Sequence, residues 1–286
     1  MGTPTFWALS GLGGAAAVAY GVFFLNRKPG FLRAIVKTLF MGALAAAFAV
    51  GHGHPVLITA LAAAALGDFF LAFDKKWLLP LGIIAFLIAQ LGYLTIFFFN
   101  WMFAGDNAPL WPRYAGMALV LACLAAFLAW FWRIPEMKRA PWSGAVAVLA
   151  PLAIGLVLPA YLLSIVTLLG KAQDKPDLIA VLPLGALLVA AAAFTWLRRD
   201  LGVIRLAAMI YAGVITLMAC AAMWIPWPAW AAMLGALFFL VSDFVLAAEL
   251  FRLPADATVK RYTTPAVWWT YVAAQALIII GVTQLR

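Results

Sequence analysis

Charged side chains are scarce in this chain. They make up 10% of its 286 residues, whereas hydrophobic residues make up 67%; a soluble domain has about 25% charged residues. A core of this length cannot hide so much apolar surface, so we expect lipid to be the solvent around the chain. The net charge of +9 does not indicate a nucleic-acid partner, because the basic residues are scattered through short loops.

Cysteine and histidine are also scarce, with two of each. Cys123 and Cys220 lie inside apolar runs, where cysteine acts as a small core residue, so we expect neither a disulfide nor a metal-binding pair. His52 and His54 stand in a Gly-Pro turn, GHGHP, which favours a loop over a metal site. The sequence gives no sign of a metal or an organic cofactor.

Long apolar runs are abundant, and runs of about 20 residues are long enough to cross a bilayer as helices. Ten such runs stand at residues 6–25, 34–50, 56–73, 78–103, 114–132, 143–170, 178–197, 206–225, 231–251 and 266–284. They predict an all-α, polytopic membrane helix bundle that forms a single transmembrane domain over residues 1–286.

The basic residues agree with ten spans. Of the 19 Lys and Arg residues, 14 fall in the loops after the first, third, fifth, seventh and ninth spans. Cytoplasmic loops carry such an excess, so we expect an integral, multi-pass protein, as in a bacterial inner membrane, with both termini outside the cytoplasm.

Polar side chains collect in the cytoplasmic half of these spans. At about 1.5 Å per residue, Asp68 and Asp243 lie about 9 Å and 12 Å from the cytoplasmic end of their runs. Other polar groups at similar depth are Lys37, Gln90, Tyr93, Tyr211, Tyr271 and Gln275. Gln90 and Tyr93 continue a stripe from Gly82 and Phe86. We expect one polar cavity that opens towards the cytoplasmic leaflet.

The two aspartates are the strongest functional candidates, because carboxylates inside a membrane are costly and face the bundle interior. A purely structural pair would need a basic partner, and we expect none at that depth. Each of the other polar residues also has a structural interpretation when taken alone. Tyr211 would anchor its helix at the membrane interface, and Gln90 and Gln275 would hydrogen-bond neighbouring helices. The side chain of Lys37 would snorkel to the membrane surface.

Several stretches resemble the successive signatures of the lysoplasmalogenase (YhhN-like) family. They are LGDFFL, LPLGIIAFLIAQLGY, IYAGVITLM, GALFFLVSDFVLA and TYVAAQALI, in that order. The resemblance is strongest over residues 30–103 and 206–284. The family has about eight spans, so residues 114–170 would add a helix pair. Gln90 stands where the family has a histidine, and Val272 where it has a tyrosine. If the family histidine transfers protons, we expect this chain to be slow, altered in substrate or not an enzyme.

The resemblance implies an ether-bond hydrolase that cleaves the vinyl ether bond of lysoplasmalogens into a fatty aldehyde and a glycerophospho-head group. Such bonds hydrolyse through an oxocarbenium ion. Glycosidases use a pair of carboxyl groups for a transition state of this kind. One of Asp68 and Asp243 would be the general acid and the other the stabilising base. Gln90, Tyr93, Tyr271 and Gln275 would position water and the ether oxygen, and Lys37, with Arg33, would meet the phosphate of a lysophospholipid from the cytoplasmic leaflet.

Two other functions use the same aspartates. A proton-coupled transporter would carry paired carboxylates in its bundle, although it would also need polar residues on both sides of the midplane and internal repeats. A lipid-binding protein would tolerate the loss of either aspartate. Release of aldehyde from a lysoplasmalogen separates these functions from the hydrolase.

Overall fold

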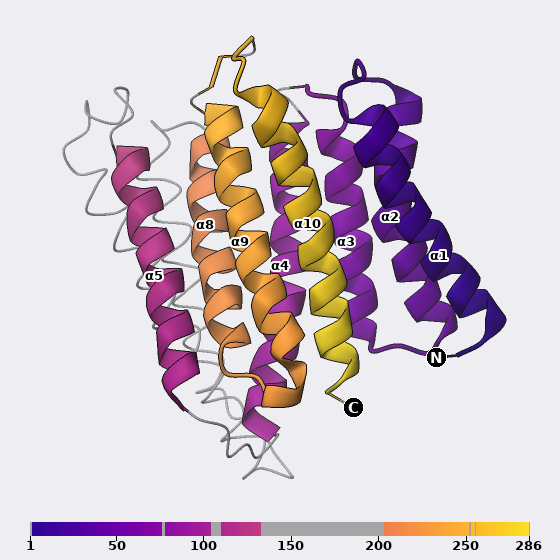
Figure 1. The fold of residues 1–286 in the computed structure, drawn as a ribbon, viewed down its shortest axis with the longest axis vertical. Helices are drawn as coiled ribbons and strands as arrows, with labels where there is room; N and C mark the ends of the chain where they lie inside the picture. Colours follow the sequence, from indigo (N-terminus) through magenta and orange to yellow (C-terminus); the bar gives the residue numbers. More distant parts are fainter. Residues whose placement is uncertain are drawn as a thin grey trace. The chain divides into compact units, whose positions relative to one another are not determined.

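The structure, a computed structural model, describes residues 2–75, 78–103, 110–132, 203–251, 253–254 and 256–285. All regular structure in these ranges is helical, which confirms the all-α prediction for them (Figure 1). The spans expected at 143–170 and 178–197 lie outside the described residues. The chain divides into two compact units, one of residues 1–123 and 215–286, the other of residues 124–214.

The first unit holds most of the described helices. They are α1 (Pro4–Ala19), which continues into the π-helical turn η1 (Tyr20–Phe24), α2 (Phe31–Val50), α3 (Pro55–Leu71), α4 (Leu79–Phe103), the 3₁₀ turn η5 (Trp227–Ala229), α9 (Trp230–Phe251) and α10 (Lys260–Thr283). Helices α5 (Leu110–Trp132) and α8 (Val203–Ala222) each run from one unit into the other. In the second unit, the described residues are the end of α5 and the beginning of α8.

The composition of these helices suits a membrane. Among the described residues, five stretches are long and apolar enough to cross one: Pro4–Phe24, Phe31–Val50, Leu81–Trp101, Trp227–Phe251 and Lys260–Thr283. Three shorter apolar helices are Pro55–Leu71, Trp111–Phe127 and Ile210–Ala222. By length and composition, the described part of the chain has the helices of a multi-pass membrane protein.

The last helix begins earlier than its apolar run predicts. α10 starts at Lys260, six residues before the expected start at 266, and contains Pro265 in its second turn. Proline removes only one backbone hydrogen bond near a helix start, and the carboxylate of Glu249 accepts hydrogen bonds from the hydroxyls of Thr263 and Thr264. These contacts tie the first turn of α10 to α9, so the helix extends beyond the apolar run.

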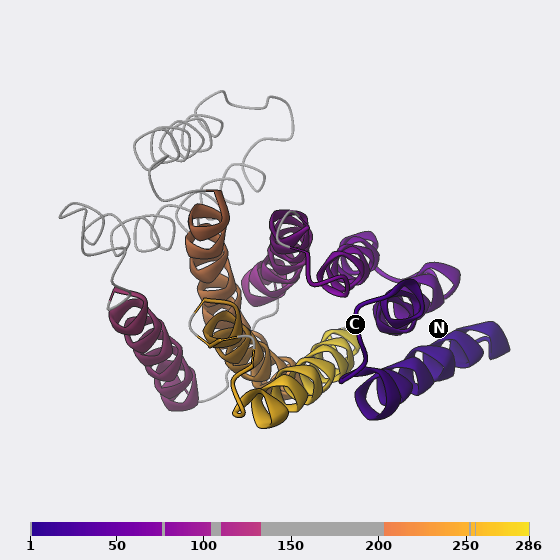
Figure 2. The same cartoon turned by 90° about the horizontal axis from the view of Figure 1, so that it is seen from above.

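Within the first unit, helices that follow one another in sequence pack together: α1 on α2, α2 on α3, α3 on α4, and α9 on α10. Figure 2 shows α1 to α4 in a row, with α10 beside α9. Glycine permits the closest of these approaches. A Cβ atom at Gly281 would lie 2.4 Å from the backbone nitrogen of Ala232, so α9 and α10 are in backbone contact there.

Neighbouring helices in the first unit run in alternate directions, and both termini lie at the same end of this unit (Figure 1). We refer to the other end, where α1, α3 and α9 finish and α2, α4 and α10 begin, as the Asp68 end. Arg27, Arg33, Lys75 and Arg261 lie in or beside the loops and helix ends at the Asp68 end. This arrangement agrees with the predicted alternation of basic loops.

Candidate functional site

Asp68 lies near the end of α3, on a helix that is otherwise apolar or neutral. Its side chain is 1% exposed. α3 ends at Leu71, so Asp68 lies only about 4.5 Å from the helix end along the axis, about half of the predicted depth. The turn after the helix explains the difference, because Asp74 adopts φ 52°, a left-handed conformation that stops the helix early.

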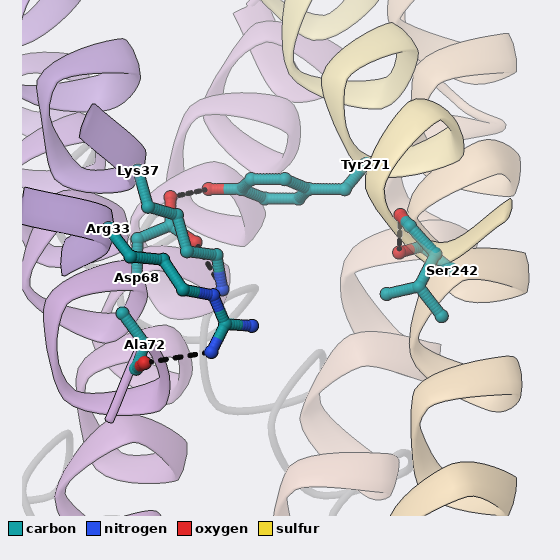
Figure 3. A network of polar contacts seen from close by, with 7 residues as sticks. Arg33, Lys37, Asp68, Ala72, Ser242 and Tyr271 are labelled. Atoms are coloured by element: carbon teal, nitrogen blue, oxygen red, sulfur yellow. Dashed lines mark hydrogen bonds and ion pairs between the residues drawn. The ribbon is translucent and has the colours of Figure 1, made fainter. Parts of the chain in front are cut away.

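Each carboxylate oxygen of Asp68 has its own partner. The ammonium nitrogen of Lys37 lies 3.3 Å from Oδ1, and the hydroxyl of Tyr271 donates to Oδ2 at 2.9 Å (Figure 3). The three side chains come from α2, α3 and α10 and meet in the interior. The buried carboxylate is therefore both charge-paired and hydrogen-bonded.

The prediction that Asp68 has no basic partner is wrong. Lys37 was expected to snorkel towards the surface, because the axial position of its Cα is near the beginning of its apolar run. Its long side chain instead turns inward from α2, which packs against α3, and is 15% exposed. The Cα of Lys37 lies nearer the surface than Asp68, but the long side chain is able to cover this difference in depth.

Aromatic rings surround the Lys37–Asp68 pair. The Lys37 nitrogen lies 5.9 Å from the ring centre of Tyr20 and 6.0 Å from that of Trp268, both in cation–π range. Tyr20 belongs to the π-helical turn η1, and Trp268 lies one turn before Tyr271 on α10. These rings shield the ion pair between Lys37 and Asp68.

Tyr271 is fixed by packing as well as by its hydrogen bond. Four rings lie with their centres 5.6–6.0 Å from its own, those of Phe40, Phe86, Phe239 and Trp268. They come from α2, α4, α9 and α10. Because the phenol is held on these sides, its hydroxyl has little freedom to leave Asp68.

A second polar contact joins α4 and α10. The hydroxyl of Tyr93 donates to Oε1 of Gln275 at 2.6 Å, and both side chains are fully buried. Gln275 lies one turn beyond Tyr271 on α10. The stripe predicted on α4 is confirmed, because Phe86, Gln90 and Tyr93 are all buried.

Arg33 closes the surface side of the site. Its Nη1 atom donates to the backbone oxygen of Ala72 at 3.1 Å (Figure 3). The same atom pairs with Oδ2 of Asp74 at 2.9 Å. These contacts hold α2 against the turn after α3. Phosphate binding by Arg33 and Lys37 stays a prediction.

Two further predicted site residues, Asp243 and Tyr211, have no contact with Asp68 among the interactions described above. Asp243 lies on α9 in the first unit and is partly exposed. The hydroxyl of its neighbour Ser242 donates to the backbone oxygen of Val267 on α10 (Figure 3). Tyr211 belongs to the second unit. The pairing of Asp68 with Asp243 stays a prediction.

A cavity that the sequence did not suggest lies at the end of the first unit opposite the Asp68 end. It has a volume of about 380 Å³. Its lining comes from Phe48, His54, Val56, Leu57, Thr95, Ile96, Phe99, Asn100, Val282, Thr283 and Leu285. Among the residues that the structure describes, no side chain in this lining is acidic or carries the fixed charge of Lys or Arg. Apolar side chains give no periodic signal within apolar helices, so nothing in the sequence marked this space.

Metal and thiol chemistry have no visible centre in the described part of the chain. No group of three His, Cys, Asp or Glu residues there could hold a metal ion, and Cys123 and Cys220 are free thiols.

Comparison with known proteins gives a family. No curated protein and no solved structure matches the chain significantly. The sequence profile of the YhhN family matches residues 32–154 and 147–282, which together make up most of the chain. This family includes lysoplasmalogenases. The chain belongs to the YhhN family.

Proposed function

We propose that this protein is a membrane lysoplasmalogenase that hydrolyses the vinyl ether bond of lysoplasmalogens. The observation that carries the proposal is the Asp68 carboxylate, buried in an apolar helix and held by Lys37 and Tyr271. Membership of a family that includes lysoplasmalogenases supports it. A buried carboxylate with fixed partners is costly in a membrane and typical of a functional site.

The chemistry divides between two aspartates. An acid protonates the β-carbon of the vinyl ether, which leaves an oxocarbenium ion; water adds to that ion, and the hemiacetal breaks down to aldehyde and alcohol. Asp68 suits the carboxylate role, because Lys37 and Tyr271 both stabilise its ionised form. The acid role then falls to Asp243, which is partly exposed on α9.

The substrate would enter from the cytoplasmic leaflet at the Asp68 end. Arg33 and Lys37 place positive charge there, where a lipid phosphate would lie in a membrane oriented by the basic loops. The vinyl ether stands a few bonds below the phosphate, so a shallow carboxylate meets the reacting carbon. Ten spans, with both termini outside the cytoplasm of a bacterial inner membrane, are part of this proposal.

The test uses three lysophospholipids that differ only at the first chain. Purified protein in detergent micelles receives the vinyl ether, the saturated alkyl ether or the acyl ester, and free fatty aldehyde is measured. We expect aldehyde from the vinyl ether alone, because only its double bond can be protonated to an oxocarbenium ion. Folded protein that releases no aldehyde would contradict the proposal and favour a transporter or a lipid-binding protein.

A further inference from the structure

The side-chain amide nitrogen of Gln275 has no hydrogen-bond acceptor among the described residues. The side chain of Gln275 is fully buried on α10, and its Nε2 atom is without a hydrogen-bond partner in the described part of the chain. A buried donor without an acceptor lowers stability, because the group has lost its hydrogen bonds to water. The amide therefore marks a position for a polar molecule that accepts a hydrogen bond.

The neighbouring hydroxyl groups fix where this position is. Tyr93 donates to Oε1 of Gln275, so the Nε2 side of the amide faces away from Tyr93. The Tyr271 hydroxyl lies one turn away on the same face of α10, within hydrogen-bonding range of the Gln275 side chain, and interacts electrostatically with Tyr93. Tyr271 donates its proton to Asp68, so its oxygen acts as an acceptor towards any other group.

We propose that the Gln275 amide and the Tyr271 hydroxyl together hold the water that attacks the oxocarbenium ion, and that Tyr271 relays the proton of this water to Asp68. The inference rests on the proposed function and adds to it the path by which the base acts. The amide donates to the oxygen of the water, while the water donates to the oxygen of Tyr271. Tyr271 already donates to Asp68, so the three groups form a continuous chain.

The proton balance closes over one turnover. As the water oxygen bonds to the cationic carbon, one water proton moves to Tyr271, and the Tyr271 proton moves to Asp68. The hemiacetal then breaks its bond to the glycerol oxygen, which takes the proton from Asp68. The hydroxyl proton of the hemiacetal goes to Asp243, which had lost its own to the β-carbon. Both aspartates return to their starting states, and the products are one aldehyde and one glycerophospho alcohol.

The relay has a signature that aldehyde release alone does not give. An oxocarbenium ion that water fails to capture reverts to the vinyl ether by losing a proton from the β-carbon. In D₂O, that carbon carries one added deuterium beside its original hydrogen. The bond between the two carbons of the cation is single and rotates, and a C–H bond breaks faster than a C–D bond, so the recovered substrate becomes labelled. Labelling of unreacted lysoplasmalogen therefore reports a working acid step with impaired water addition.

The experiment compares Tyr271→Phe and Gln275→Met with the wild type in D₂O. Tyr271→Phe keeps the packed ring, and Gln275→Met keeps the length of the side chain. We expect aldehyde release to fall about 100-fold and the recovered lysoplasmalogen to carry deuterium at the vinyl β-carbon. Thr270→Val is the matched control, because Thr270 only donates to backbone oxygens of its own helix; it should behave as the wild type, without label.

Other outcomes decide against the relay. Loss of aldehyde without label in folded variants would mean that Tyr271 and Gln275 support the acid step or the fold instead, and wild-type aldehyde release by either variant would equally overturn the proposal. If either substitution prevents folding, Tyr93→Phe removes the hydroxyl that orients Gln275 and should give the same label with a smaller loss. A wild type that neither releases aldehyde nor labels its substrate would defeat the proposed function itself.

Discussion

The Asp68 site and the cavity at the opposite end of the first unit differ in the hydrogen bonds that their polar side chains form. At the Asp68 end, polar contacts join separate helices: Lys37 of α2 and Tyr271 of α10 both reach Asp68 of α3. In the lining of the cavity at the opposite end, the hydroxyls of Thr95 and Thr283 and the amide of Asn100 donate to backbone oxygens of their own helices. The first kind of contact fixes how helices stand against one another, whereas the second only satisfies a polar group in an apolar setting.

The two ends of the first unit also differ in open volume and in charged side chains. The opposite end has an open cavity of about 380 Å³, and the described residues of its lining carry no fixed charge. The Asp68 end has an ion pair enclosed by aromatic rings. Under the proposed function, open volume is a poor guide to the chemistry of this chain. Buried polar contacts between distant segments are the better guide, since each must offset the cost of removing polar groups from water.

The largest expected effect concerns the acid. Asp243→Asn removes the proposed proton donor but keeps the size of the side chain, so aldehyde release from lysoplasmalogen should fall by about 10²–10⁴-fold. The control is Ser242→Ala, one residue away, which removes a hydroxyl that only bonds the backbone of α10. Its rate should stay within about threefold of wild type. Equal losses in the two variants would assign the effect to helix packing.

An intermediate effect is expected at Lys37. Lys37→Met leaves the Asp68 carboxylate buried without its cation, and breaking a buried pair from one side is strongly destabilising. We expect a loss of about 3 kcal/mol, read as a lower midpoint of thermal unfolding in detergent. The double variant Lys37→Met with Asp68→Asn removes both charges and should recover most of this loss. A double variant no more stable than Lys37→Met would argue against the ion pair.

The smallest effect is expected at the opposite end. The ring nitrogen Nδ1 of His54 accepts a hydrogen bond from the backbone of Val56 and caps α3. This side chain is exposed, so His54→Ala should lower stability by about 0.5 kcal/mol and leave aldehyde release unchanged. Thermal unfolding and the aldehyde assay check the two parts. A large loss of activity would place chemistry at the cavity instead.

Much of the fold follows from apolar runs alone. Every predicted span within the described residues coincides with a helix, because length and hydropathy dominate the choice in lipid. The start of α10 was predicted too late, because residues 260–265 are too polar to join the apolar run. The contacts of Glu249 with Thr263 and Thr264 that support this turn come from another helix. Contacts of this kind are invisible in a local pattern.

The site was predicted in part. Asp68, Tyr93, Tyr271 and Gln275 stood out as polar residues in apolar runs, and the structure buries all four. The ion pair was missed because backbone depth takes no account of a long side chain such as that of Lys37. The rings around Tyr271 were missed because an aromatic residue in an apolar helix carries no distinguishing signal.

The most direct test of the central claim compares one substitution at each end. Aldehyde release from lysoplasmalogen is measured for purified Asp68→Asn and Asn100→Leu under the same conditions as the wild type. Asp68→Asn removes the buried carboxylate, whereas Asn100→Leu changes a side chain in the lining of the open cavity. We expect a loss of at least about 100-fold for Asp68→Asn and a rate within about twofold of wild type for Asn100→Leu. Folded Asp68→Asn with the wild-type rate would contradict the account.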